Sequence, residues 1–196
     1  MSMRREQILT AAGELASEAG LSALSVRAVA RRSGIGASTL RHYFPTQQDL
    51  YTAVLQARFD AQLEDRSIGD STQPAAQRLV DCVSQFLPPA DDQVQQLQHW
   101  LGMHAAALGP ESTTQAHDLL AAFSARANER IGHWLATLAE EGALRHADQD
   151  RAHLLLNTVI DGLSLQFLTP GPEISLDAAR AVLTDVVTGL IVAENR

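Results

Sequence analysis

The twenty residues 25–44, Ser25-Val-Arg-Ala-Val-Ala-Arg-Arg-Ser-Gly-Ile-Gly-Ala-Ser-Thr-Leu-Arg-His-Tyr-Phe44, decide the fold of this chain. Ser25 is a favoured N-cap residue, and the apolar residues after it recur at the spacing of one helix face until Gly34. Beyond the turn at Gly34, a second helix of about seven residues is predicted from Ser38 to Phe44. Two short helices joined by a tight glycine-containing turn are typical of a helix-turn-helix.

The second of these helices carries more polar side chains than solubility requires. Only Leu40 and Phe44, four residues apart, form an apolar pair that can pack on the preceding helices. Five polar or aromatic hydrogen-bond donors would point outward: Ser38, Thr39, Arg41, His42 and Tyr43. Such a face suits the phosphates and base edges of a DNA major groove, so the motif indicates a DNA-binding protein.

Helical periodicity continues on both sides of the motif. A first helix is expected over 3–19 with Gly20 as its C-cap, while Pro45 ends the motif and Thr46 caps a fourth helix running to about residue 64. Later helices are expected at about 74–87, 92–108, 111–141, 149–168 and 176–194. The fold class is therefore all-α, with about nine helices.

The polar, turn-rich stretch over 67–74 predicts a boundary between two domains. Residues 1–46 would form the helix-turn-helix domain, with the motif at about 25–44 and the fourth helix, 47–64, as a link. Residues 67–196 would form a larger helical domain.

Charge is divided unevenly along the chain. Residues 1–60 hold seven Arg and five acidic residues, a net charge of +2, whereas the rest of the chain holds eight Arg and eighteen acidic residues, a net charge of −10. A basic end on an acidic body attracts phosphate with that end only. The single cysteine, Cys82, excludes an intramolecular disulfide, and no apolar run approaches the roughly 20 residues of a membrane span, so a cytoplasmic protein is expected.

Residues 5–55 resemble the DNA-binding domain of the tetracycline-repressor (TetR) family of regulators. The positions in the family's register are Ile8, Leu9, Ala11, Ala12, Gly20, Ala30, Gly34, Leu40, Tyr43, Phe44 and Leu50. The resemblance implies that Arg27 reaches base edges and that Ser38 and Arg41 face the groove floor. It implies that Thr39, His42 and Tyr43 hold phosphates. The implied interface comprises Ser25, Arg27, Ser38, Thr39, Arg41, His42, Tyr43 and Gln47.

Two positions depart from the family pattern. Arg41 stands where the family usually has Tyr, so this side chain can make a bidentate base contact or bind phosphate, and the preferred DNA sequence can differ. Gln47 stands where the family usually has a phosphate-binding Lys, so one charge-assisted contact per subunit is lost.

The predicted helix 176–194 carries a nearly continuous apolar stripe, and the predicted helix 149–168 is apolar on more than one side, so its second apolar face implies a partner. In TetR-type proteins these helices of two subunits form a four-helix bundle, and residues 67–196 would be a ligand-sensing and dimerisation domain. The expected interface residues are Leu163, Phe167, Leu183, Val187 and Leu190. The alternative is that 149–168 is the central core helix of a monomer. Residues 159–167 also resemble, more weakly, a subgroup that includes choline-responsive repressors, without implying that ligand.

A ligand pocket is expected among the middle helices of this domain, where large or soft apolar side chains lie near a titratable group. Its candidate residues are Phe86, Trp100, Met103, His104, Phe123 and Trp134. Ordinary core packing is the alternative for each. No two histidines have metal-ligand spacing with a carboxylate nearby, so neither a metal nor a cofactor is expected.

These features together predict a homodimeric transcriptional regulator, most naturally a repressor, that binds double-stranded DNA at a palindromic operator and is released by a small-molecule effector. An activator of the same fold is the nearest alternative. A helical small-molecule-binding protein, a helical enzyme or a nucleoid-type structural binder is a more distant one. No recognisable catalytic arrangement favours an enzyme.

Overall fold

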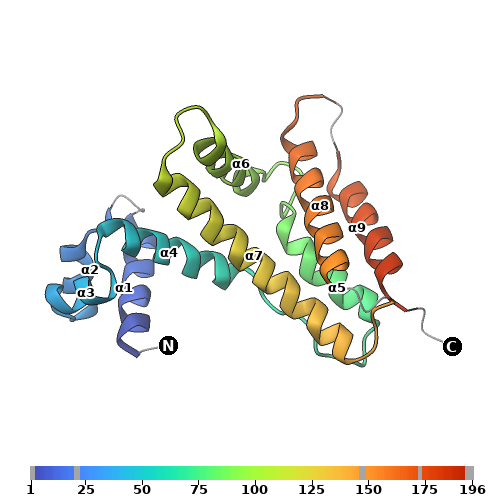
Figure 1. The fold of residues 1–196 in the computed structure, drawn as a ribbon, viewed down its shortest axis with the longest axis horizontal. Helices are drawn as coiled ribbons and strands as arrows, with labels where there is room; N and C mark the ends of the chain where they lie inside the picture. Colours follow the sequence, from blue (N-terminus) through green and yellow to red (C-terminus); the bar gives the residue numbers. More distant parts are fainter. Residues whose placement is uncertain (1–2, 20–22, 146–148, 172–173, 193–196) are drawn as a thin grey trace. The chain divides into compact units, whose positions relative to one another are not determined.

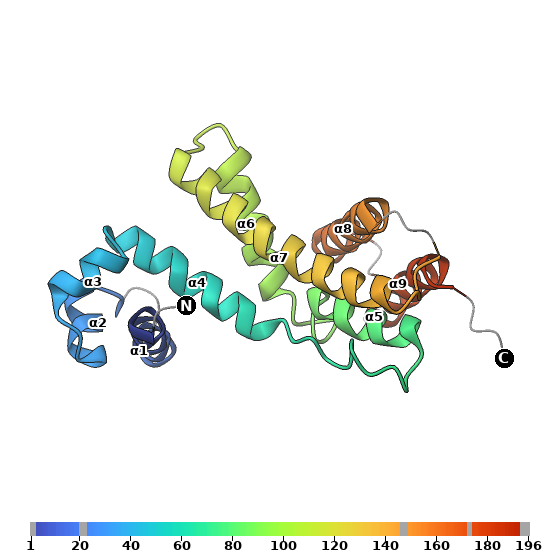
Figure 2. The same cartoon turned by 60° about the horizontal axis from the view of Figure 1, so that its bottom comes forward.

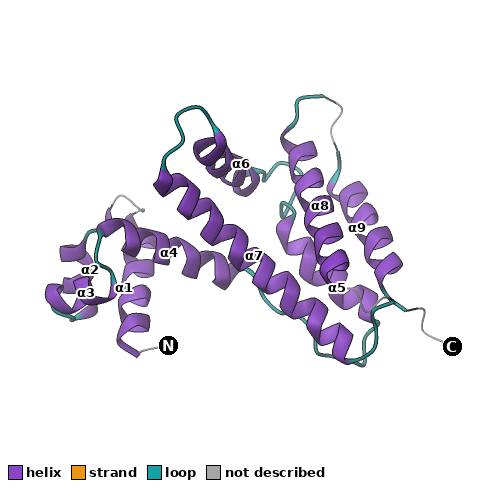
Figure 3. Cartoon of the chain, viewed as in Figure 1, coloured by secondary structure: helices purple, strands orange, loops and turns teal. Residues whose placement is uncertain are grey.

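The computed structural model describes residues 3–19, 23–145, 149–171 and 174–192, and within them all regular structure is helical (Figures 1 and 3). Its helices are α1 (Met3–Ala19), α2 (Val26–Ser33), α3 (Ala37–Tyr43), α4 (Gln47–Gln62), α5 (Ala75–Val83), the 3-10 helix η2 (Ser84–Phe86), α6 (Gln95–Leu108), α7 (Thr114–Glu140), α8 (Gln149–Leu168) and α9 (Leu176–Leu190). The prediction of an all-α chain with about nine helices is confirmed for this part of the chain. Gly20, the expected cap of α1, lies outside the described residues.

The chain forms two compact units, residues 1–62 and 63–196. In the first unit, α1 packs against α2 and α4, and α2 packs against α3. Leu40 and Phe44 retain 0% and 2% of their surface, so the expected apolar pair is buried. The core around them contains Ile8, Ala12, Ala16, Leu24, Val29, Leu50, Ala53 and Val54.

Side-chain caps and a left-handed glycine set the ends of helices in the first unit. The Ser25 hydroxyl accepts a hydrogen bond from the Ala28 amide at 3.2 Å and caps α2. Gly34 ends α2 at φ +69°, a left-handed conformation that glycine adopts without strain. At the start of α4, the Thr46 hydroxyl accepts from the Asp49 amide at 3.0 Å, and an Asp49 carboxylate oxygen accepts from the Thr46 amide at 2.8 Å.

In the second unit, α5 lies against α7 and α9, as Figure 2 also shows. The predicted helix over 74–87 ends earlier, at Val83, and continues as η2. The predicted helix 176–194 ends at Leu190 because the chain becomes extended at Ile191. There the Val192 amide donates to the Ala143 carbonyl at 2.8 Å, and backbone pairing replaces the helical hydrogen bonds.

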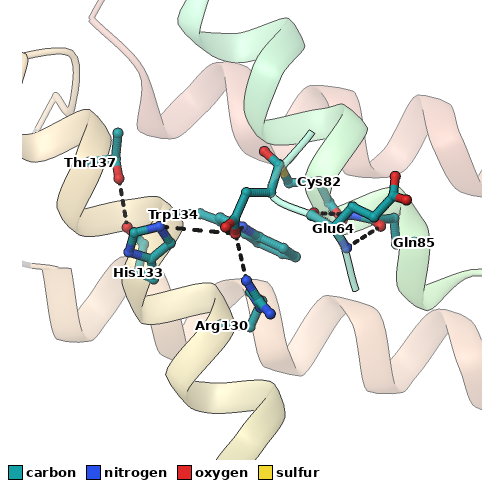
Figure 4. A network of polar contacts seen from close by, with 8 residues as sticks. Glu64, Cys82, Gln85, Arg130, His133, Trp134 and Thr137 are labelled. Carbon is teal, nitrogen blue, oxygen red and sulfur yellow. Dashed lines mark hydrogen bonds and ion pairs between the residues drawn. The ribbon is translucent and has the colours of Figure 1, made fainter. Parts of the chain in front are cut away.

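The segment that follows α4 is anchored to α5 and α7 (Figure 4). One carboxylate oxygen of Asp65 accepts from Arg130 Nη1 at 2.8 Å and from Trp134 Nε1 at 2.9 Å. The Asp65 carbonyl accepts from the Cys82 thiol at 3.3 Å, and the Gln85 side-chain amide bonds the backbone of Glu64 in both directions. Trp134 is fully buried, so Asp65 supplies the acceptor that its indole N–H needs.

Replacing Asp65 by Ala should lower the free energy of unfolding by about 1–3 kcal/mol, because the buried Trp134 N–H loses its acceptor. Glu64→Ala is the matched control. The Glu64 side chain is exposed, and its ion-pair partner among the described residues is the exposed Arg66, so its loss should cost less than about 0.5 kcal/mol. Urea unfolding measures both. Equal effects of the two substitutions would contradict the assigned role of Asp65.

The Asp65 contribution should depend on pH. Partial burial raises the pKa of the Asp65 carboxyl, but the hydrogen bonds from Trp134 and Arg130 outweigh it and hold the pKa below its ordinary value of 3.8. A lowered folded-state pKa adds stability that is present above that ordinary value and is lost as the pH falls through the lowered pKa. The stability difference between the wild type and Asp65→Ala should therefore shrink below about pH 4.

Candidate nucleic-acid interface

The exposed face of α3 is polar along its whole length. Leu40 is buried beneath it, while Ser38, Arg41 and His42 are exposed and Thr39 and Tyr43 are half-buried. The rings of His42 and Tyr43 meet edge to face with centroids 5.4 Å apart, and Tyr43 also packs against the core of the first unit. The helix is thus held from below by apolar packing and presents hydroxyl, imidazole and guanidinium groups outward.

The second contribution to this surface comes from α2. The Ser25 hydroxyl is occupied as an acceptor by the helix cap, although its own proton remains available to a phosphate. Arg27 is exposed on the first turn of α2. Arg32, further along α2, forms ion pairs with Glu14 and Glu18 of α1 and is therefore a poor candidate for a phosphate contact.

Gln47 has a structural contact that sequence reasoning missed. Its side-chain amide donates to the Leu24 carbonyl at 3.0 Å, which ties the start of α4 to the residue before the α2 cap. The Gln47 side chain stays exposed, so a contact with DNA remains sterically open, but its NH₂ group already has one partner. The sequence carries no signal for this contact, because Gln47 and Leu24 are 23 positions apart.

Arg5 also has a defined place. It belongs to α1, and its guanidinium carbon lies 5.5 Å from the centroid of the Phe44 ring, within cation–π range. The contact joins the first turn of α1 to the end of α3.

The expected pocket residues of the second unit fall into two groups. Trp134 is fully buried, and the half-buried Phe86 meets its ring at 6.2 Å, so both belong to the packed core. By contrast, all four candidates on α6 and the first half of α7 are half-buried: Trp100, Met103, His104 and Phe123. The buried residues of α7 lie in its second half, at Ile131, Trp134, Leu135 and Leu138, whereas those of α6 are Leu97 and Ala107.

The expected interface residues lie deeper than anticipated. Leu183 and Val187 are fully buried and Leu163 is 7% exposed, so the core of the chain already covers them and they offer a second copy almost no surface. Phe167 and Leu190 are half-buried against that core. The large apolar side chains that α8 and α9 expose are Leu154, Leu155, Leu165 and Val182.

A shallow hollow of about 300 Å³ opens between α8 and α9, lined by Leu155, Val186 and Gly189 together with Arg151 and Asp185. No cluster of three or more metal-binding side chains occurs among the residues that the structure describes. Within those same ranges, no helix is long and apolar enough to cross a membrane.

A helix-turn-helix with an outward polar face, followed by a larger helical unit, defines a DNA-binding regulator. Residues 8–54 match the family model of bacterial regulatory proteins of the tetR family, and residues 75–192 match that of BetI-type transcriptional repressors, C-terminal. The chain belongs to the TetR family of transcriptional regulators.

Relatives support this assignment over the whole chain. The HTH-type transcriptional regulator PksA of Bacillus subtilis is 25% identical over 98% of this chain and 92% of its own length. The regulator BetI of Cronobacter sakazakii is 24% identical over 94% of this chain and 89% of its own length. The crystal structure of a putative transcriptional regulator from Saccharomonospora viridis in complex with choline is 25% identical, has a TM-score of 0.59, and covers 99% of this chain and 100% of its own.

Substitutions in the interface should separate base contacts from phosphate contacts. Arg27→Ala and Arg41→Ala should each cost about 1–3 kcal/mol per contact on the operator and relax the preference at one symmetric position of each half-site. Thr39→Ala and His42→Ala should weaken binding to all sequences alike, because phosphate contacts carry no direct sequence information. Fluorescence anisotropy on operator and random DNA, at one salt concentration, measures the difference.

Arg32→Ala is the matched control for this series, since Glu14 and Glu18 already neutralise that guanidinium. Its effect on both DNAs should be small. Equal losses on operator and random DNA for Arg41→Ala would assign Arg41 to the phosphate contacts, and undiminished binding of both Arg27→Ala and Arg41→Ala would rule out this docking surface.

Proposed function

We propose that the chain is a homodimeric repressor that binds a palindromic operator through α2 and α3 and is released by a small molecule bound in its second unit. The observation that carries the proposal is the exposed polar face of α3 on a buried apolar base, in a chain of this family. Its site of action would be the cytoplasm, where the DNA lies. We propose a binding role only and no catalytic one, in keeping with relatives that are regulators.

The charge distribution supports binding through one end. The +2 net charge of residues 1–60 and the −10 net charge of the remainder favour an approach with the helix-turn-helix unit toward the phosphates. Two such units related by a two-fold axis enter successive major grooves about 34–36 Å apart, or a multiple of one DNA turn. A palindromic operator follows from that symmetry.

The proposed dimer interface is the exposed face of α8 and α9 and not the buried residues expected from sequence. On α8, exposed Leu165 lies one turn after Gly162 and exposed Leu155 lies two turns before it; on α9, exposed Val182 lies about two turns before Gly189. Exposed apolar side chains beside glycines allow two helix pairs to approach closely. An isologous interface would cover the hollow between α8 and α9 in both copies.

Val182→Glu should convert the dimer to a monomer, because a two-fold interface would place the two charges near each other and away from water. Thr184→Glu is the matched control: it adds the same charge to the same helix, on an exposed position of another face. Sedimentation at micromolar concentration should find dimers for the wild type and Thr184→Glu. A monomeric wild type, or a dimeric Val182→Glu, would refute this interface.

Release by a small molecule is tested by measuring thermal stability and operator binding in the presence of the same compound. A small molecule that raises thermal stability by binding the second unit should also weaken operator binding, because both effects express its preference for one conformation. Trp100→Ala should reduce both effects together, while operator affinity without the small molecule stays unchanged. Stabilising compounds that leave operator affinity untouched would contradict release by an effector.

A further inference from the structure

The helix α2 is bonded at both of its ends by the side-chain amide of a glutamine from another helix. Gln47, the first residue of α4, donates to the Leu24 carbonyl at 3.0 Å. Gln7 of α1 donates to the Ser33 carbonyl at 2.8 Å. The two acceptors lie at opposite ends of α2, since Leu24 precedes its N-cap and Ser33 is its last residue. This helix of eight residues is therefore hydrogen-bonded to both of the longer helices in its unit.

The bond from Gln7 holds the end of α2 from which the chain turns toward α3. The last carbonyls of a helix have no acceptor role within it, so the Ser33 carbonyl needs a donor from elsewhere. Ser33 is buried, and Gly34 follows it in the left-handed conformation that starts the turn. The Gln7 amide supplies the donor and thereby fixes the joint between α2 and α3.

The bond from Gln47 holds the end of α2 that carries Arg27. The Leu24 carbonyl belongs to the planar peptide group that joins Leu24 to Ser25, so fixing this oxygen fixes the direction in which the chain enters α2. Ser25 then caps the helix through its bond from the Ala28 amide. Arg27 lies on this first turn with its side chain exposed. Where its guanidinium can reach therefore depends on how this turn is held.

The start of α4 is poorly suited to bind a phosphate through Gln47. The Asp49 amide donates to the Thr46 hydroxyl, and one Asp49 carboxylate oxygen accepts from both the amide and the hydroxyl of Thr46. The carboxylate thus already places a negative charge at this helix N-terminus and would repel a phosphate there. These contacts favour a tether to Leu24 over the phosphate contact that the family's usual Lys provides.

We propose that Gln47 and Gln7 are positioning residues of the DNA interface, which hold the two ends of α2 so that Arg27 and α3 meet the base edges together. Neither glutamine needs a contact with DNA for this role. The inference rests on the proposed DNA contacts of α2 and α3. Loss of either amide should reduce the discrimination between DNA sequences more than the general attraction to phosphates, because only base contacts depend on sequence.

Gln47→Met and Gln7→Met test this role, because methionine has a similar length and no hydrogen-bond donor. The probes are the duplex that the full-length wild type selects from a random DNA pool and a scrambled duplex of the same length and composition. Fluorescence anisotropy at one salt concentration gives the specificity ratio, the Kd for the scrambled duplex divided by the Kd for the selected one. Each substitution should lower this ratio about tenfold, as the loss of a base contact would, and change the Kd for the scrambled duplex less than about twofold.

Gln48→Met is the matched control, because the Gln48 amide lies 3.5 Å from the Thr52 hydroxyl of its own helix. The substitution removes the same chemical group from the same turn of α4 without releasing α2. The specificity ratio should stay at the wild-type value.

A double-mutant cycle with Arg27→Ala identifies the side chain through which Gln47 acts. In a protein that already carries Arg27→Ala, Gln47→Met should lower the specificity ratio by less than about twofold, because the base contact that it supports is gone. Two independent contacts with DNA would instead show additive losses.

Equal weakening on both duplexes would make Gln47 a phosphate ligand and overturn its positioning role, as would additive losses in the cycle. An unchanged specificity ratio in either methionine variant would overturn the assignment of that glutamine, even if urea unfolding showed a loss of stability, since its amide would then serve the fold alone. Failure of the proposed DNA contacts would look different, because the wild type itself would bind the selected and scrambled duplexes alike.

Discussion

The packing of Leu40 and Phe44 beneath α3 is the interaction on which the rest of the DNA-binding unit depends. A helix of seven residues is too short to be stable alone in water, so its position comes from the apolar side chains that it buries. Because both anchors lie on one face, Ser38, Arg41 and His42 are left exposed, while Tyr43 packs partly against the core. The packing therefore determines which residues of α3 form the exposed surface. The identity of those polar residues then decides what the surface binds.

Sequence alone could predict the elements of this unit because their determinants are local. Ser25, Gly34 and Thr46 act through hydrogen bonds and backbone conformations within a few residues, which a sequence displays directly. The contacts that it concealed join residues far apart in the chain. Gln47 bonds Leu24 across 23 positions, and Arg5 lies against Phe44, so neither contact follows from spacing.

The second unit illustrates a different limit. Periodicity identified α8 as apolar on more than one side and α9 as carrying an apolar stripe, but it could not say which of these residues face the core of the chain. The structure places Leu183 and Val187 inside, so a charge introduced at Val187 would disrupt the fold before it tested an interface. The pocket candidates divide in the same way, since Trp134 completes the core and bonds Asp65 while Trp100 of α6 is only half-buried. Burial depends on the arrangement of whole helices, which no local pattern contains.

The central claim is that paired α3 helices recognise one operator. Hydroxyl-radical footprinting of the DNA upstream of the protein's own gene tests it most directly, because the method resolves contacts to single nucleotides. The account predicts protection at two symmetric half-sites on one side of the duplex, with centres about one helical turn, or a multiple of it, apart. Uniform protection along the DNA, or a single unsymmetric protected site at saturating protein, would contradict it.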